Sequence, residues 1–128
     1  MEVNRPDVVA EVTAAFVAYE KALVANDVAT MNALFRDADE TVRYGIAEIQ
    51  HGGAAIRAWR EVCAPVPPSR TLHRTVVTTF GADFATVSTE FTSDATPLLG
   101  RQMQTWARTG TDGGWQVVAA HVSLIAAP

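Results

Sequence analysis

The sequence predicts an α+β fold, with three helices in the first half of the chain and a mainly antiparallel sheet in the second. Apolar residues recur every three or four positions in three segments before residue 64, which is helical spacing. After residue 69 the chain is rich in Thr, Val and Phe and is divided by glycine-containing turns, as in β-hairpins. With 128 residues, 48% of them hydrophobic, we expect a single globular domain over residues 1–128.

The first helix is predicted to begin at the start of the chain, with Asn4 as a capping candidate and Pro6 in the first turn. Asn26 is predicted to end it in a left-handed conformation, and Asp27 to cap a shorter second helix. The apolar stripe of the first helix follows 3-4-3-4 spacing through Val9, Val12, Phe16, Tyr19 and Leu23. The inward face of this helix therefore includes a tyrosine.

The other elements follow from spacing and turn residues. A third helix is predicted over residues 54–63 and is ended by prolines at 65, 67 and 68. A short strand at 41–45 precedes another that ends in a turn at 53. Four longer strands are predicted at 70–80, 84–93, 98–109 and 115–125. A strongly bent sheet wrapped around the three helices would form a half-open cone.

The last hairpin decides which side chains face the inside of this cone. The predicted register places Gln104 opposite Ala119, on the same face as His121 and Ser123. A slip of one residue would bring the neighbouring side chains of strand 98–109 to the His121 face, and the sequence leaves this choice open. The opposite face of the last strand is apolar, and we expect it to pair two copies of the chain in a homodimer through Val118, Val122 and Leu124.

Composition argues against several classes of function. The net charge is −4 and there is no Lys/Arg cluster, so nucleic acid is not an expected partner. No apolar run approaches the roughly 20 residues that span a bilayer, and the start of the chain lacks the pattern of a secretion signal, so we expect a cytoplasmic protein without membrane contact. The single Cys63 and the scattered His51, His73 and His121 have no metal-ligand spacing. No cofactor motif occurs, and no cofactor is expected.

Tyr19 and Arg43 are the candidate catalytic residues. Arg43 lies in a strand-like run with Tyr44 on the opposite face, and its guanidinium cannot shed its charge, so it must be solvated, paired or used. A tyrosine on an apolar helix stripe is commonly a core residue whose hydroxyl bonds a backbone carbonyl. Beside a guanidinium, however, a phenol can act as an acid or base because the cation stabilises the phenolate.

The predicted order of elements resembles the ketosteroid-isomerase-like fold, also called the nuclear-transport-factor-like superfamily or cystatin-like roll, over nearly the whole chain. The closing run Trp115–Ser123 is similar to the last strand of that superfamily, in which a tryptophan follows a tight turn and a His-x-Ser sequence lines the pocket. This fold hosts enzymes, carriers and assembly domains, so it does not determine the function.

A more specific resemblance is to the bacterial oxalurate catabolism proteins. It is carried by Glu11–Glu20, Asn26–Thr30, Thr41–Gly45, Arg70–Leu72, Arg101–Trp106 and Ala119–Ser123. That family includes the decarboxylating amidohydrolase of 1,3-dicarboxyurea in cyanuric acid breakdown. A tyrosine of its first helix and an arginine of its first strand are implicated in catalysis, and these match Tyr19 and Arg43.

The resemblance implies a metal-independent enzyme without a cofactor that acts on a small anionic ureido substrate. Arg43 would orient a carboxylate, and Tyr19 would protonate the nitrogen left when carbon dioxide departs. The substrate-binding candidates are Arg70, Gln104, His121, Ser123 and Trp59. Arg70 could instead be a solvated strand-end residue, and Trp59 is expected to be core as well as pocket wall.

Two other functions stay open from the sequence. The chain could be a non-catalytic ligand-binding accessory of a neighbouring amidase. The isomerase chemistry for which the fold is named needs an inward carboxylate base, and the sequence indicates none: Glu90, for example, is expected to pair with Arg74 across a hairpin. The exact substrate, and whether the net reaction is hydrolysis or decarboxylation, are not determined by these residues.

Overall fold

The computed structural model describes residues 1–128 and confirms the predicted α+β order. The helices are α1 Pro6–Ala25, α2 Val28–Leu34 and α3 Gly53–Val62. The strands are β1 Val42–Tyr44, β2 Ile49–His51, β3 Thr71–Phe80, β4 Phe84–Ser93, β5 Thr96–Ala107 and β6 Gln116–Ile125, with a short 3-10 helix, η1 Thr111–Gly113, in the last turn. No helix is both long and apolar enough to cross a membrane.

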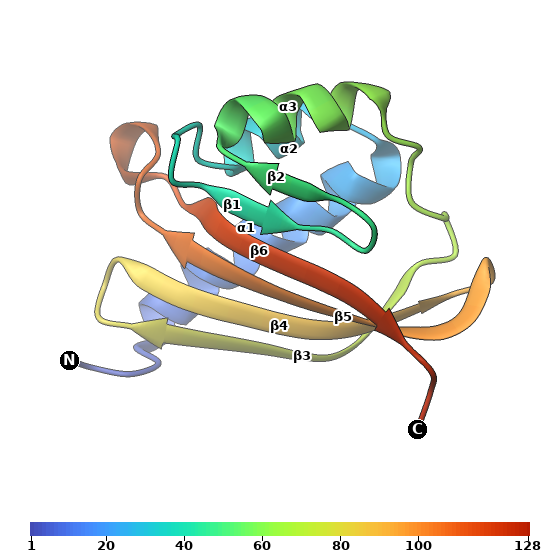
Figure 1. Cartoon of the computed structure of the whole chain (residues 1–128). Coiled ribbons are helices and arrows are strands. Elements are labelled where there is room, and N and C mark those ends of the chain that lie inside the picture. Colours follow the sequence, from blue (N-terminus) through green and yellow to red (C-terminus); the bar gives the residue numbers. More distant parts are fainter.

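The six strands form one sheet in the order β2-β1-β6-β5-β4-β3. The β1–β6 pair is parallel and every other pair is antiparallel. In Figure 1, α1 crosses behind the long strands, and α3 lies beside the short β1–β2 hairpin. The helices therefore cover one face of the sheet, called here the inner face, and leave the outer face toward the viewer.

The ends of the first two helices follow the predicted chemistry, with one exception. Asn26 adopts a left-handed conformation with φ 53°, and the Asp27 carboxylate accepts a hydrogen bond from the Thr30 backbone N–H at 3.1 Å. The prediction that Asn4 caps α1 is wrong, because the cap position is Arg5. Asn4 instead accepts a hydrogen bond from the Thr79 backbone N–H at 3.0 Å, which ties the N-terminus to β3.

The core lies between the helices and the inner face of the long strands. Tyr19 is buried within it, 4% exposed, and packs against Trp106 and Phe35 with ring centroids 6.5 and 5.7 Å away. The stripe predicted for α1 is buried except that Val8, rather than Val9, lies in the core, while Leu23 packs at its edge. The other core side chains are Val12, Phe16, Ala22, Met31, Ile56, Ala85, Val87, Trp115 and Val117.

The predicted register of the last hairpin is wrong beyond its first pairs. Trp106 lies opposite Val117 as expected, but Val118 has no partner on β5 and forms a bulge. One additional residue moves every later side chain of β6 to the other face. As a result His121 lies opposite Met103 on the outer face.

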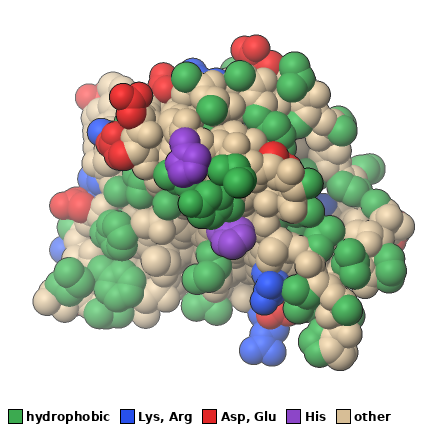
Figure 2. Space-filling view, viewed as in Figure 1, with side chains coloured by type: hydrophobic (Ala, Val, Ile, Leu, Met, Phe, Trp, Pro, Cys, Tyr) green, Lys and Arg blue, Asp and Glu red, His purple; other side chains and the backbone are tan.

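The same bulge overturns the expected dimer surface. Val122 and Leu124 line a cavity on the inner face, so they cannot form the outward patch predicted for them. The outer face instead carries Tyr44, whose ring lies between His51 and His121 with centroids 6.1 and 5.6 Å away. Figure 2 shows two histidines on either side of a hydrophobic patch on this face.

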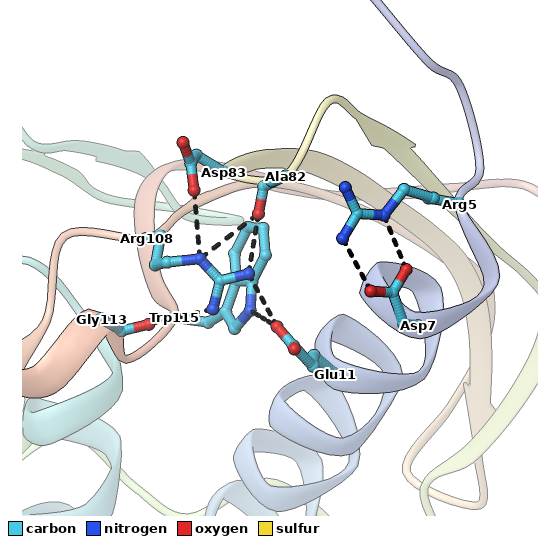
Figure 3. Close-up of polar contacts among 8 residues, drawn as sticks. All are labelled: Arg5, Asp7, Glu11, Ala82, Asp83, Arg108, Gly113 and Trp115. Atoms are coloured by element: carbon cyan, nitrogen blue, oxygen red, sulfur yellow. Dashed lines mark hydrogen bonds and ion pairs between the residues drawn. The ribbon is translucent and has the colours of Figure 1, made fainter.

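Arg108 joins three segments at one end of the sheet (Figure 3). Its Nη2 donates to the Glu11 carboxylate at 2.7 Å, and Nε donates to the Asp83 carboxylate at 3.1 Å. Further hydrogen bonds go to the carbonyls of Ala82 and Gly113. Glu11 also accepts from Trp115 Nε1 at 3.1 Å. These bonds connect α1 with both hairpin turns.

Neighbouring carboxylates at this end are held in their ionised forms. The hydrogen bond from Trp115, and then that from Arg108, lower the pKa of Glu11. Close by on the first turn of α1, a two-point contact with Arg5 lowers the pKa of Asp7 to about 2 (Figure 3).

Candidate functional site

A cavity of about 330 Å³ opens on the inner face, between α1, the β1–β2 turn, the linker that follows α3, and strands β4 to β6. This volume suits a small molecule. Four residues predicted for the site line it: Tyr19, Arg43, Trp59 and Arg70. They come from four different elements, and most of the remaining wall is apolar.

Arg43 is held at one side of the cavity by its own chain. Its Nη1 donates to the Glu48 carboxylate at 2.9 Å and to the Gln50 side-chain oxygen at 3.0 Å. The guanidinium carbon lies 3.9 Å from the centroid of the Trp59 ring, a cation–π contact. Its Nε and Nη2 form no hydrogen bond with the protein. Arg43 is therefore positioned firmly while keeping donors available.

Gly45 permits this arrangement in the tight β1–β2 turn. A Cβ at position 45 would overlap the Glu48 carboxylate and crowd Nη1 of Arg43. Any side chain at position 45 would therefore force the Arg43–Glu48 ion pair to shift. The same strand directs Tyr44 to the outer face, as predicted from the alternation of side chains.

Arg70 is held at another wall by a buried polar network. Its Nε and Nη2 donate to the two oxygens of Glu20 at 3.0 and 3.2 Å, and Nη2 also donates to Gln102 at 3.1 Å. Gln102 in turn donates to Glu20 at 3.0 Å. The guanidinium carbon lies 4.1 Å from the Phe91 ring centroid. With a side chain only 5% exposed, Arg70 is not the solvated strand-end arginine considered as an alternative.

Three predicted binding residues do not reach the cavity. His121 and Ser123 lie on the outer face because of the Val118 bulge, so their predicted placement in the pocket is wrong. Gln104 faces inward but is buried in the core, where it accepts a hydrogen bond from Trp106 Nε1 at 3.1 Å. It is absent from the cavity wall. Gln102, two residues before Gln104 on β5, lines the cavity in its place.

The structure also places two carboxylates at or behind the cavity wall that the sequence analysis did not identify. Glu48 lines the cavity and is 28% exposed, and Glu20 lies behind the wall, paired with Arg70. A signal for Glu48 was present, since it follows Arg43 across the Gly45 turn and is two residues from Gln50, which lies opposite Arg43 in the hairpin. Glu20 gave no such signal, because its partner is 50 residues away in the chain. The predicted ion pair of Glu90 with Arg74 is confirmed at 3.5 Å, although His73 and not Arg74 lies opposite Glu90 in the register.

The wall offers anion and hydrogen-bond contacts rather than a metal cage. No group of three or more His, Cys, Asp or Glu side chains is arranged to hold a metal ion. What the wall offers is two guanidinium groups, one carboxylate, an amide and a phenol around an apolar space. This set can bind an oxyanion and exchange a proton with a ligand.

Comparison with known proteins agrees with this architecture. A family model described as AtzH-like matches residues 1–128. The chain belongs to the AtzH-like family. No curated protein sequence matched it.

Two solved structures are close to this AtzH-like chain. A cystatin-like fold protein from Burkholderia xenovorans LB400 is 77% identical, with a TM-score of 0.98 over 100% of this chain and 99% of that one. A protein of unknown function from the DUF3225 family of Pectobacterium atrosepticum is 50% identical, with a TM-score of 0.91 over 96% and 94% of the two chains.

A more distant match supports the predicted fold of this AtzH-like protein. An NTF2-like protein of unknown function from Pseudomonas putida KT2440 is 20% identical, with a TM-score of 0.74 over 93% of this chain and 87% of that one. At this identity the likeness concerns the fold alone. The cone predicted from the order of helices and strands is thus confirmed at the level of the cystatin-like and nuclear-transport-factor-like fold.

Proposed function

We propose that this AtzH-like protein is an enzyme that removes carbon dioxide from a small N-carboxylated urea, without a metal or cofactor. The single observation that supports the proposal is that one cavity is lined both by Tyr19 and by Arg43, whose Nε and Nη2 are free. The resemblance to oxalurate catabolism proteins and to their 1,3-dicarboxyurea amidohydrolase supplies the substrate class.

The charges around the cavity support an anionic substrate. Arg43 and Arg70 line the wall and Arg60 lies behind it, while Glu48 and Glu20 are the carboxylates that pair with the first two. Three guanidinium groups against two carboxylates leave one positive charge. A ligand carboxylate would neutralise it, and the mostly apolar wall would strengthen the attraction by excluding water.

The proposed step uses residues of this chain alone. Free donors of Arg43 bind the carboxylate of the substrate and orient it. The bond between the carboxylate carbon and the urea nitrogen breaks, its electron pair stays on nitrogen, and the carboxylate leaves as carbon dioxide. Tyr19 transfers its hydroxyl proton to that nitrogen and regains a proton from water.

The proposal is tested by incubating the purified protein separately with N-carboxyureas, oxalurate and allophanate while carbon dioxide and ammonia are measured. We expect release of carbon dioxide from an N-carboxyurea above the spontaneous rate, and loss of this release in Tyr19→Phe. Tyr44→Phe is the matched control, because Tyr44 is the chain's second tyrosine and lies on the outer face. No release above the spontaneous rate from any of these compounds would overturn the proposal.

A second candidate function is binding without turnover, as an accessory of an amidase. The observation that favours it is that Arg43 and Arg70 already have carboxylate partners, as in a rigid binding site. It predicts that calorimetry detects ureido acid binding while no product forms. Glu48→Gln tests for isomerase chemistry, because an isomerase that uses Glu48 as its base would lose all turnover, whereas the proposed reaction would lose only the part that depends on the Arg43–Glu48 ion pair.

A further inference from the structure

Arg60 on α3 is a buried cation that takes part in no step of the proposed reaction. It is 2% exposed and forms no ion pair with any carboxylate of the chain. Its Nη2 donates to the Tyr19 hydroxyl oxygen at 3.3 Å, its Nη1 donates to Met31 Sδ at 3.2 Å, and its Nε has no hydrogen-bond partner. A charge buried without a counter-ion is costly, so it needs a reason.

The surroundings of Arg60 only partly compensate for this burial. Its guanidinium carbon lies 4.7 Å from the ring centroid of Phe35 and 5.7 Å from those of Tyr19 and Trp59. Aromatic faces attract a cation but less strongly than a carboxylate does. Arg43 and Arg70, by contrast, each have a carboxylate within 3.0 Å.

We propose that Arg60 is a positioning residue that keeps the Tyr19 hydroxyl hydrogen directed at the cavity and stabilises the phenolate left after that hydrogen is transferred. This inference rests on the proposed role of Tyr19 as the proton donor. Arg60 itself does not line the cavity, so it acts through Tyr19 and not on the substrate.

The hydrogen bonds of Tyr19 determine where its hydroxyl hydrogen points. A guanidinium has only donors, so the Tyr19 oxygen must be the acceptor of the bond with Arg60. The phenol hydrogen cannot point at Arg60 as well, and no other group of the chain forms a hydrogen bond with this hydroxyl. Tyr19 lines the cavity, so its hydrogen is left for a ligand group there.

The charge of Arg60 favours transfer of the proton from Tyr19. While Tyr19 is a neutral phenol, Arg60 is an unpaired buried cation. Once the proton has moved to the substrate nitrogen, the phenolate and Arg60 form an ion pair in the core. Stabilisation thus appears as the proton is transferred, which is the condition for lowering a barrier instead of only tightening binding.

The kinetic test compares Arg60→Met, which keeps much of the side-chain length and removes the charge, with Arg57→Met. Arg57 is the matched control, because it is on the same helix and forms an exposed ion pair with Asp37. We expect Arg60→Met to lower kcat roughly 10- to 100-fold with KM little changed, and Arg57→Met to change neither. In a Tyr19→Phe background Arg60→Met should cause no further loss. An equal further loss there, or an unchanged kcat in the single variant, would overturn the inference.

A second measurement needs no substrate. The chain has two tyrosines, so in a Tyr44→Phe background the near-ultraviolet absorbance of phenolate reports Tyr19 alone. We expect the Tyr19 phenolate to form at higher pH when Arg60→Met is added, and Arg60→Lys to restore most of the difference. The charged groups that face Tyr19 from other elements, Arg43, Glu48 and Arg70, and Glu20 on its own helix, are unchanged in these variants.

The two measurements separate the inference from the proposed function. If no ureido acid is turned over but the titration shifts as expected, the proposed function fails and the Arg60–Tyr19 coupling stands. If turnover depends on Tyr19 but neither kcat nor the titration responds to Arg60→Met, the coupling alone is wrong. Arg60→Gln is the second neutral variant should Arg60→Met not fold by circular dichroism.

Discussion

The arginine at the turn end of the sheet and those at the cavity are held in different ways. All three guanidinium nitrogens of Arg108 donate hydrogen bonds to groups of the chain. Arg43 uses only Nη1, and Arg70 leaves Nη1 unused. The arginine with the most hydrogen bonds is also the most exposed: the Arg108 side chain is 26% exposed, while those of Arg43 and Arg70 are 11% and 5% exposed.

The difference suggests a criterion for interpreting arginines in this fold. A half-buried arginine whose three guanidinium nitrogens all donate to the chain connects segments and has little left for a ligand. A buried arginine with free donors beside a cavity is costly to keep unless a ligand completes its bonds. We therefore expect Arg108 to contribute to stability, and we propose ligand binding as the role of Arg43 and Arg70. The following variants test this division.

The largest expected effect is at Tyr19. Tyr19→Phe keeps the packing against Trp106 and removes only the hydroxyl, so the fold should survive while turnover falls roughly 100-fold or more, the scale of a lost general acid. Steady-state kinetics and thermal melting measure the two effects. A change in melting temperature without a change in rate would assign Tyr19 to the core.

Arg43→Lys should reduce kcat/KM by roughly 10- to 100-fold, because lysine keeps the charge but loses the planar set of donors and the stacking on Trp59. Arg101→Lys on the exposed outer side of β5 is the control and should change little. Equal kinetics of the two variants on the true substrate would remove Arg43 from the site.

Arg108→Met should lower stability and leave turnover unchanged. Loss of its hydrogen bonds to two turns and α1 should lower stability by about 2 kcal/mol and the Tm by roughly 5 °C or more. Turnover at low temperature should match that of the wild type. Differential scanning calorimetry together with kinetics tests this, and a loss of turnover in the folded variant would break the division between the two regions.

The pH dependence of stability should show the contribution of Glu11. Hydrogen bonds from Trp115 and Arg108 lower its pKa below the usual 4.5 in the folded state. Its stabilising effect is therefore present above that value and is lost as the pH falls through the folded pKa. Glu11→Gln should melt below the wild type at neutral pH, and the gap should narrow under acidic conditions. A gap independent of pH would argue against this assignment.

The smallest effect on turnover is expected from the outer face. We expect a homodimer, with Tyr44 and Met103 of the outer face, 42% and 60% exposed, as the paired surface. Met103→Glu should then give a monomer by light scattering at micromolar concentration while the cavity residues keep their function. A wild-type mass equal to one chain would eliminate the dimer.

The sequence was sufficient for the fold because the decisive signals are local. Helical spacing placed Tyr19 inward, glycine turns fixed the hairpins, and strand alternation separated Arg43 from Tyr44. The sequence was insufficient for β6, because the unpaired residue of the bulge is Val118, and valine is an ordinary strand residue that does not mark a bulge. A single additional residue was enough to move His121 out of the predicted site.

The candidate site was only partly predictable for a related reason. Arg70 and Glu20 become meaningful together, through a contact between α1 and the start of β3 that no local pattern encodes. The burial of Arg60 was easier to predict. Arg60 follows the buried Ile56 by one helical turn and therefore occupies the apolar face of α3. A charged residue in such a position was the signal that could have been followed.

Gly100 on β5 leaves room for a side chain of the neighbouring strand. It lies opposite Phe91 on β4, and the Phe91 ring occupies the space that any side chain at position 100 would need. The guanidinium of Arg70 rests on that ring. An alanine at position 100 would displace this ring and with it the surface on which Arg70 rests. The position of one charge in the cavity wall thus depends on a residue that has no functional group.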